Sequence, residues 1–421
     1  MIIIQNPYVD ECYEKSRLTC NILENNVQKQ IWFEVQNEFA KYLCYERGDA
    51  FLIALIYYAM EKGHDIKSEV AITDELLYNI NEYLIPTLHK SDKRLKNIKI
   101  EAPFAPRLNN AGAVGTGLSC GTDSFHAILN NIHSPFPENK LTHVCINNVG
   151  SFDVYSFYGN EEAQNVKNAI YKKAQNIANE LNIPLIQTES NLMTEIPQNH
   201  LYTNTYSSMF AVFCLQKLWK TYFYASVGYG FEAFNLINNS TKDSGLYDLL
   251  TLNCFSNKNL RIYSEGGAKT KLEKIKFIAD FDITQKHLHV CIKKTKNCGI
   301  CSKCKRTILV LDSIGKLDKF KNVFDINYYK THKNDYLKWL CVSHFNKDKM
   351  NEPTYQILKK SIPLHVKMLA LLEFHKIFYI NFEDENTLKI RFLIFSHKFK
   401  TRKNRTIVER ERERESNNST L

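Results

Sequence analysis

The sequence contains no long apolar run, and its start lacks a basic segment ahead of an apolar one. Its longest apolar run, residues 51–60, falls far short of the roughly 20 residues that a membrane-spanning helix needs. Residues 1–7 also lack the basic region of a secretory signal. We therefore expect a cytoplasmic protein without a membrane segment. In that compartment the twelve cysteines are expected to be thiols or metal ligands rather than disulfides.

Length and charge narrow the class of protein further. A chain of 421 residues is longer than one typical domain and can bury a large core. Hydrophobic residues at 44% and charged residues at 24% are typical of globular proteins. The formal charge of +10 comes from 55 lysines and arginines against 45 acidic residues, and much of the excess lies late in the chain. This charge weakly favours nucleic acid as a partner and is compatible with a polyanionic nucleotide.

One stretch rich in glycine and serine, residues 115–124, lacks residues that two common phosphate-binding motifs require. A Walker A loop ends in Gly-Lys-Ser/Thr, and this stretch contains no lysine. A dinucleotide-binding loop needs a third glycine where Cys120 stands. The stretch nevertheless follows a strand predicted at 113–118 and precedes a helix predicted at 125–129. Because a helix N-terminus presents unpaired N–H groups and a positive partial charge, this arrangement predicts an anion site.

The loop carries side chains suited to binding a phosphate group. The hydroxyls of Ser119, Thr122 and Ser124 can donate hydrogen bonds to phosphate oxygens. The carboxylate of Asp123 can accept from loop N–H groups or help to place a magnesium ion. Cys120 is the unusual member of the loop. If its backbone adopts a positive φ, a residue other than glycine there costs on the order of 1 kcal/mol.

From residue 113 onward, predicted strands alternate with predicted helices. Apolar residues recur at helical spacing over 161–181, and a further helix is expected at 204–219. The strands are expected at 113–118, 141–147, 183–188, 222–228 and 261–263. This alternation predicts an α/β fold with a doubly wound, mostly parallel sheet. Ligands of such sheets bind beyond the carboxyl ends of the strands, where the loop at 119–124 is expected to lie.

The domain organisation follows from shifts in pattern along the chain. We predict an N-terminal α+β domain at 1–105, a nucleotide-binding domain at 106–325, a helical C-terminal region at 326–397 and a disordered charged tail at 398–421. The elements expected in the first domain are strands at 28–35 and 97–102 and helices at 49–63 and 73–83. The C-terminal helices are expected at 335–343 and 355–374. Residues 235–245, rich in Asn, Ser and Thr, are expected to form a mobile loop near the site.

Four cysteines form a second group of candidate functional residues. They are Cys291, Cys298, Cys301 and Cys304, in the pattern C-x6-C-x2-C-x2-C. Two-residue spacers let consecutive sulfurs face one ion, and a strand predicted at 287–291 brings in the first cysteine. Zinc is the metal that we expect, in a structural role because all four positions are filled by protein. An iron–sulfur cluster is the alternative, although the continuation typical of bacterial ferredoxins is missing.

The loop sequence Ser-x-Gly-x-Asp-Ser resembles the PP-loop of the ATP pyrophosphatase superfamily. Together with the four cysteines downstream, residues 110–325 are similar to the 7-cyano-7-deazaguanine synthase family, although Cys120 replaces a glycine and residues 1–105 form an extension. The resemblance implies an adenine nucleotide alpha hydrolase type of fold and a zinc ion on the four cysteines. The loop residues that it implies as ligands of the ATP phosphates and Mg²⁺ are Ser119, Gly121, Thr122, Asp123 and Ser124.

The same resemblance implies a ligase that forms C–N bonds. The oxygen of a carboxylate or amide attacks the α-phosphate of ATP, pyrophosphate leaves, and a nitrogen nucleophile then displaces AMP. On this reading the catalytic residues are Ser119, Asp123, Ser124 and Lys269, and the partners are ATP and a carboxylate-bearing substrate. Nucleic acid or protein is also possible as the substrate.

Cations must offset the phosphate charge, and two candidates stand out. Lys269, Lys271 and Lys274 begin a predicted helix after a glycine turn, where a cation opposes the helix dipole unless an anion is bound. Among them we favour Lys269 as a phosphate contact over a merely solvated lysine. Arg306 can reach a phosphate or a substrate carboxylate with two hydrogen bonds. The alternative for Arg306 is a position on a helix surface near the metal site.

Two other functions remain open at this point. A tRNA- or nucleotide-thiolating enzyme of the PP-loop class needs a reactive cysteine, and a helix N-terminus would lower the thiol pKa of Cys120. A small residue tolerated in place of glycine is the alternative that we favour for Cys120. The charge of +10 and the basic tail instead suggest a non-catalytic, zinc-stabilised protein that binds nucleotides or nucleic acid.

Overall fold

The computed structural model describes residues 1–11, 14–150, 160–230, 242–291, 294–375, 378–384, 387–392 and 395–400. These residues belong to two compact units, Met1–Tyr329 and Lys330–Leu421. Among the described residues, no helix combines the length and the apolar character needed to cross a membrane. No disulfide joins the cysteines of these described residues.

The first unit is built on one large mixed sheet, and its central strands are all parallel. They are β9 (Ala113–Gly117), β10 (His143–Asn148), β11 (Leu185–Ser190), β12 (Trp219–Ala225) and β13 (Arg261–Glu265). Their order across the sheet is β13-β12-β9-β10-β11. The chain moves outward from β9 in one direction and then returns to β12 on its other side. The carboxyl ends of β9 and β12 thus form the switch point at which doubly wound sheets bind ligands.

The sheet continues into the N-terminal residues through antiparallel pairs and ends in two parallel ones. β4 (Val27–Gln36) pairs with β11, so that Val35 lies opposite Thr188. Beyond it follow β3 (Lys15–Glu24), β1 (Ile2–Ile4), β5 (Ile66–Ser68) and β7 (Ile100–Glu101), with β2 (Tyr8–Glu11) flanking β3. The predicted α/β class with a mostly parallel sheet is confirmed. Strands from both sides of residue 105 share this sheet, and the domain boundary there stays a prediction.

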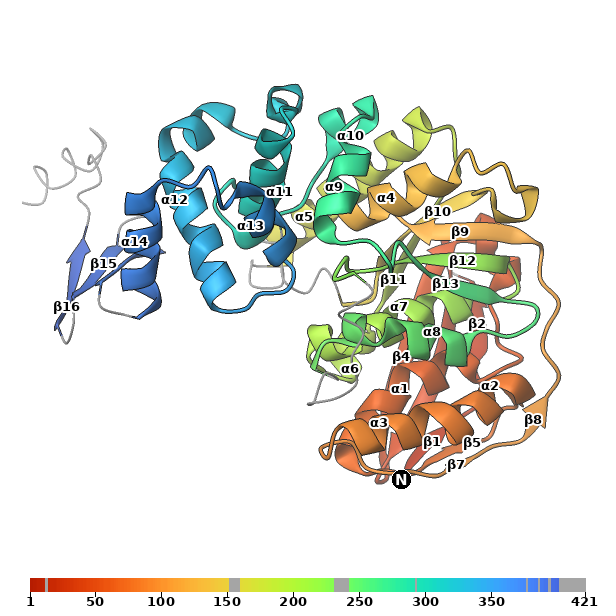
Figure 1. The fold of residues 1–421 in the computed structure, drawn as a ribbon. Helices are drawn as coiled ribbons and strands as arrows, with labels where there is room; N and C mark the ends of the chain where they lie inside the picture. The colour runs from red at the N-terminus through yellow and green to blue at the C-terminus, as the bar shows by residue number, and fades with distance from the viewer. Residues whose placement is uncertain are drawn as a thin grey trace, which may run out of the picture. The chain divides into compact units, whose positions relative to one another are not determined.

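Helices cover both faces of the sheet (Figure 1). On one face, α1 (Asp49–Lys62) packs against α7 (His200–Cys214), and α8 (Asp248–Phe255) lies beside α7. On the other face, α4 (Thr122–Asn131) packs against α9 (Lys271–Ile278), which in turn contacts α11 (Ser302–Ser313). Helices α5 (Asn160–Glu180) and α10 (Asp282–His287) pack against each other. The predicted helix over 161–181 is therefore confirmed as α5.

Of two helices predicted in the N-terminal region, one ends where it was predicted to end and the other is longer than predicted. The predicted end of α1 at Gly63 is confirmed, because this residue adopts the left-handed conformation with φ 72°. The helix predicted at 73–83 is longer than expected. It starts as α2 (Asp74–Asn79), passes through a π-helical turn (Ile80–Leu84) and continues as α3 (Ile85–Ser91). Pro86 lacks an N–H group, and the wider turn before it accommodates that missing donor.

Three other predictions are corrected by the structure. The helix predicted at 204–219 ends at Cys214, because the buried Trp219 already pairs with Ala113 as the first residue of β12. The strand predicted at 287–291 does not form, because residue 287 ends α10 and residues 288–291 have no strand partner among the described residues. The strand predicted at 97–102 shortens to β7, and a separate two-stranded pairing joins β6 (Ile72–Thr73) to β8 (Phe104–Ala105). The short helix α6 (Leu192–Glu195) completes the helices of the central region.

The C-terminal region is largely helical, as predicted. Its helices are α12 (Ile326–Phe345), α13 (Glu352–Leu358) and α14 (Leu364–Phe374), and Pro363 separates the last two. The sequence patterns missed a three-stranded antiparallel sheet of β14 (Phe378–Asp384), β15 (Thr387–Phe392) and β16 (Phe395–Lys400). The tail from 401 onward lies outside the described residues, as do positions 235–241 of the predicted mobile loop.

Candidate functional site

The predicted anion loop lies at the switch point of the sheet. Strand β9 ends at Gly117, and α4 begins at Thr122 with Gly121 as its N-cap. The hydroxyl of Ser124 donates to the carbonyl of Gly121 at 3.1 Å and lies 3.2 Å from the hydroxyl of Ser119. The strand, loop and helix expected here are therefore present. Because the first N–H groups of a helix point back along its axis, those of α4 face the loop that follows β9.

Cys120 adopts the strained backbone that the sequence raised as a possibility. Its φ is 60°, a left-handed conformation that costs a side-chain-bearing residue about 1–2 kcal/mol. Its side chain is buried, and burial raises the pKa of the thiol to about 11, against the smaller opposing effect of Lys173. The lowered pKa that the thiolation alternative requires is thus not found, because the loss of water on burial raises the pKa of this thiol. Cys120 stays a protonated thiol near neutral pH.

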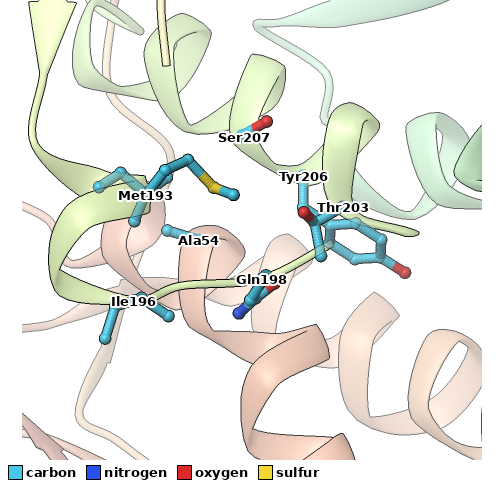
Figure 2. A pocket seen from close by; sticks show the side chains of 8 residues that line it. Ala54, Met193, Ile196, Gln198, Thr203, Tyr206 and Ser207 are labelled. Atoms are coloured by element: carbon cyan, nitrogen blue, oxygen red, sulfur yellow. The ribbon is translucent and has the colours of Figure 1, made fainter. Parts of the chain in front are cut away.

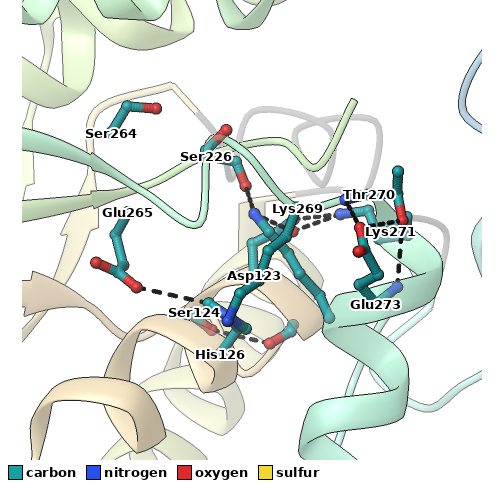
Figure 3. A network of polar contacts seen from close by, with 12 residues as sticks. Asp123, Ser124, His126, Ser226, Ser264, Glu265, Lys269, Thr270, Lys271 and Glu273 are labelled. Carbon is teal, nitrogen blue, oxygen red and sulfur yellow. Dashed lines mark hydrogen bonds and ion pairs between the residues drawn. The ribbon is translucent and has the colours of Figure 1, made fainter. Parts of the chain in front are cut away.

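Asp123 lies in the first turn of α4 and pairs with two lysines of α9 (Figure 3). Lys271 Nζ donates to both carboxylate oxygens at 2.6 and 2.5 Å, and Lys274 Nζ lies 3.5 Å from one of them. Burial alone would raise the pKa of Asp123, but the charges of Lys271 and Lys274 outweigh it and hold the pKa below its ordinary value. Burial lowers the pKa of Lys271 to about 8, although Asp123 opposes that change.

Lys274 ties this pair to the neighbouring strand. Its amine is fully buried and donates to the carbonyl of Ser226, just beyond β12, at 2.6 Å. Two residues later, Gly228 has φ 85°, and a Cβ there would lie 3.2 Å from Lys271 Cε and 3.4 Å from Asp123 Oδ1. A side chain at this position would crowd the ion pair. The ends of β9 and β12 and the start of α9 therefore converge on one small polar region.

The sequence placed Lys269, Lys271 and Lys274 at one helix start and favoured Lys269, whereas the structure brings the other two lysines to Asp123. Thr270 and Glu273 form a capping box, so α9 begins at Lys271. Residues three apart on a helix share a face, which brings Lys271 and Lys274 together and leaves Lys269 ahead of the helix. A Thr-x-x-Glu pattern is visible in the sequence and could have placed the helix start.

Lys269 instead lies beside His126 of α4. Its amine is 3.1 Å from Nε2 of the imidazole, and it also lies over the ring of Phe277. Burial, followed by the charges of Lys274 and Lys269, lowers the pKa of His126 to about 3, so the ring is neutral. Nδ1 of this ring has no hydrogen-bond partner and lies 3.8 Å from Glu265. Whether Lys269 contacts phosphate, as predicted, stays open.

Helix α11 brings two more cations into the electrostatic field of this region. The charge of Lys303 lowers the pKa of Asp123, and the charge of Arg306 lowers the pKa of Lys271. The Arg306 side chain is buried, so the alternative of a position on the helix surface does not apply. The loop around Asp123 therefore lies among several positive charges, as a site for a polyanion requires.

The four cysteines come together as their spacing predicts. Their sulfurs all lie within 4.8 Å of one another. A tetrahedral zinc site with bonds of about 2.3 Å places its sulfurs roughly 3.8 Å apart, so this cluster fits such an ion. Gly299 has φ 75° and makes the tight turn, while Cys301 is the N-cap of α11 and Cys304 lies in its first turn. The cluster could therefore bind a metal ion such as zinc.

One residue that supports this cluster escaped the sequence patterns. The Asn297 side chain accepts from the N–H groups of Val290 and Cys291 at 2.8 and 3.2 Å. It donates to the carbonyls of Leu288 and Val323 at 2.9 and 3.0 Å. This amide thus replaces the strand partner that residues 288–291 lack. Nothing in a lone asparagine beside a cysteine signals such a role.

A small hollow in the same unit lies away from the loop (Figure 2). Most of its lining comes from α1, α6 and α7, including Ala54, Met193 and Tyr206, and the amide nitrogen of Gln198 there has no partner. The hollow is too small for a nucleotide and its walls are largely apolar. The loop at 119–124 therefore stays the candidate functional site, and this hollow is not part of it.

Comparisons with family models, with curated proteins and with solved structures found no match to this chain. The chain is a mixed α/β protein with a largely parallel sheet and a four-cysteine cluster. Its likeness to the ATP pyrophosphatases accordingly remains a hypothesis drawn from the loop and the cysteine spacing.

Proposed function

We propose that this protein is an ATP-dependent enzyme that releases AMP and pyrophosphate while joining a carboxylate or amide to a nitrogen nucleophile. The observation that carries the proposal is the position of Ser119–Ser124 at the switch point, facing Lys271 and Lys274. The loop resembles a PP-loop, and the cations around it suit a triphosphate. The 7-cyano-7-deazaguanine synthase family supplies the nearest chemical precedent in sequence pattern.

Each part of the loop has a role in this reaction. Loop N–H groups and the hydroxyls of Ser119 and Ser124 hold the β- and γ-phosphates, which become the leaving pyrophosphate. Asp123 helps to place Mg²⁺, and Lys271, released from that carboxylate, pairs with a phosphate oxygen. The substrate oxygen attacks the α-phosphorus, and the bond to the bridging oxygen breaks with its electron pair leaving on pyrophosphate. The nitrogen nucleophile then attacks the adenylated carbon and expels AMP.

Zinc is the metal that best suits the four cysteines, and its role is structural. Four thiolate ligands leave no position for an activated water, and the thiolate donors favour zinc or an iron–sulfur cluster over a hard cation. Metal analysis of the purified protein, with an absorption spectrum, separates the two. One zinc per chain without visible absorption supports the proposal, and iron with acid-labile sulfide contradicts it.

The reaction is tested through its products. The protein is incubated with Mg²⁺, ATP, an ammonium salt and a panel of carboxylic acids, and the nucleotide products are separated. We expect AMP and pyrophosphate in equal amounts, while ADP and inorganic phosphate would contradict the proposal. Lys271→Met should abolish the product, because the buried cation beside Asp123 is lost. Lys276→Met is the matched control, since Lys276 lies exposed on the same helix.

The structure gives no support to sulfur transfer through Cys120. The thiol is buried and its pKa is raised, whereas an attacking sulfur must be exposed and ionised. A carboxylate presented by a nucleic acid or a protein remains compatible with the proposed activation step. A purely non-catalytic role in binding nucleic acid predicts salt-dependent affinity without release of pyrophosphate.

A further inference from the structure

The phosphate loop and the four-cysteine segment are joined by a backbone hydrogen bond. The N–H group of His289 donates to the carbonyl of Cys120 at 2.8 Å. A Cβ on Gly121, the next residue of the loop, would lie 3.8 Å from the carbonyl oxygen of His289. His289 lies two residues before Cys291, the first cysteine of the cluster. One short stretch of chain therefore contacts the loop at one end and the candidate metal at the other.

The loop residue that accepts this hydrogen bond is the strained one. A non-glycine residue holds φ 60° only where its surroundings outweigh the strain. For Cys120 these surroundings are a buried thiol and the bond from His289. If that donor moves, Cys120 can relax toward a negative φ. The following N–H groups at the start of α4 would then turn away from the phosphate position.

The stretch 289–291 is also held in place at the end that leads into the four-cysteine cluster. The Asn297 side chain holds the N–H groups of Val290 and Cys291, and a metal ion would fix the Cys291 sulfur to the other three. Without the ion, the four sulfurs are no longer held together, and Asn297 is left to hold the segment. The position of the His289 N–H group thus depends on the occupancy of the cluster.

Helix α11 provides a second link between the two regions. Cys301 caps this helix and Cys304 lies in its first turn, so a metal ion fixes its start. The same stretch carries Lys303 and Arg306, whose charges act on Asp123 and Lys271. A shift of this helix start would weaken the positive field at the loop.

From these contacts we infer that the four-cysteine centre positions the phosphate loop, so that metal binding and MgATP binding strengthen each other. The inference rests on the proposed function, because it takes the loop ligand to be a nucleotide triphosphate. The His289 backbone and Asn297 act as positioning groups and do not touch the nucleotide. Thermodynamic linkage requires the effect to be reciprocal: if the metal tightens MgATP binding by some factor, MgATP tightens metal binding by the same factor.

The His289 hydrogen bond can be removed with a single pair of variants. His289→Pro deletes the N–H donor, and His289→Ala keeps it while also losing the imidazole. The preceding residue, Leu288, has φ −55° and ψ 125°, an extended conformation that a following proline accepts. With equal zinc content in both proteins, we expect the dissociation constant of Mg·AMP-CPP, in which a methylene group replaces the α,β-bridging oxygen that the proposed reaction cleaves, to be about 5-fold higher for His289→Pro. Equal dissociation constants would overturn the inference.

A second measurement uses the unaltered chain and decides the matter if His289→Pro fails to fold. The zinc affinity is measured by competition with a chelator, with and without saturating Mg·AMP-CPP. A dissociation constant for zinc that is several-fold lower in the presence of the nucleotide supports the coupling, and an unchanged dissociation constant contradicts it. If the zinc-loaded wild-type protein binds no Mg·AMP-CPP at all, the result contradicts the proposed function itself, and the coupling is rejected with it.

Discussion

The four-cysteine cluster and the ion pairs around Asp123 differ in how far along the chain their members lie. All four cysteines fall within residues 291–304, and their sulfurs meet as the spacing predicts. Asp123 and Lys271 are 148 positions apart, and the sequence patterns selected Lys269 as the lysine near the loop. A site built by local turns can be read from spacing. A site built by convergence of separate elements requires the tertiary structure to name its members.

The largest effect is expected from removing one member of the local site. Cys304→Ser should lose the metal and several kcal/mol of stability, because a structural metal contributes folding energy directly. Metal content and thermal unfolding measure both outcomes. Cys254→Ser is the matched control, since Cys254 is a buried thiol of the same unit outside the cluster. A Cys304→Ser protein with full metal content and an unchanged midpoint would show that the cluster is only a packing feature.

The next effect separates the lysine that the sequence suggested from those that the structure brings to Asp123. Lys271→Met should weaken MgATP binding by about 10- to 100-fold, as expected for loss of a charge-assisted hydrogen bond in a partly buried site. Lys269→Met should change it by less than about 3-fold, since its amine contacts His126. Equilibrium dialysis with labelled nucleotide gives both values. The reverse order would restore Lys269 as the phosphate contact.

A pH titration tests the state of the same lysine. The pKa of Lys271 is lowered to about 8, so its amine is charged below this pH and loses its proton above it. Since the charged form binds phosphate, MgATP affinity should be constant up to about pH 8 and then fall by up to roughly 10-fold per pH unit. Lys271→Arg keeps its charge throughout and should remove the decline. A wild-type profile that stays parallel to that of Lys271→Arg would contradict the assignment.

The smallest effect concerns the loop backbone. At φ 60°, Cys120→Gly should be more stable than Cys120→Ala by about 1 kcal/mol, because alanine keeps the strain and glycine relieves it. Both variants lose the same buried thiol, so their difference isolates the backbone term. Urea unfolding of the two proteins measures it. An alanine variant as stable as the glycine variant would mean that the loop relaxes around residue 120.

Several features could be predicted because they depend on neighbouring residues. The C-cap at Gly63 follows from a glycine after an apolar helix. The existence of α4 follows from a small-residue loop before apolar residues, although the helix begins at Thr122 and not at the predicted residue 125. Trp219 was misplaced for the opposite reason. Its apolar character suited either the end of a helix or the start of a strand, and only pairing with Ala113 decided between them. Asn297 gave no signal, because its four partners are spread over residues 288–323.

The sequence by itself determined the α/β class, the loop at Ser119–Ser124 and the cysteine cluster. Each depends on hydrophobic periodicity or on the spacing of residues within a short segment, and the backbone of such a segment can adopt only a few conformations. Only the tertiary structure decided that β4 joins the sheet beside β11, that Lys271 and Lys274 meet Asp123, and that His289 supports Cys120. These contacts join elements far apart in the sequence, and they form only when strand order and helix packing bring those elements together.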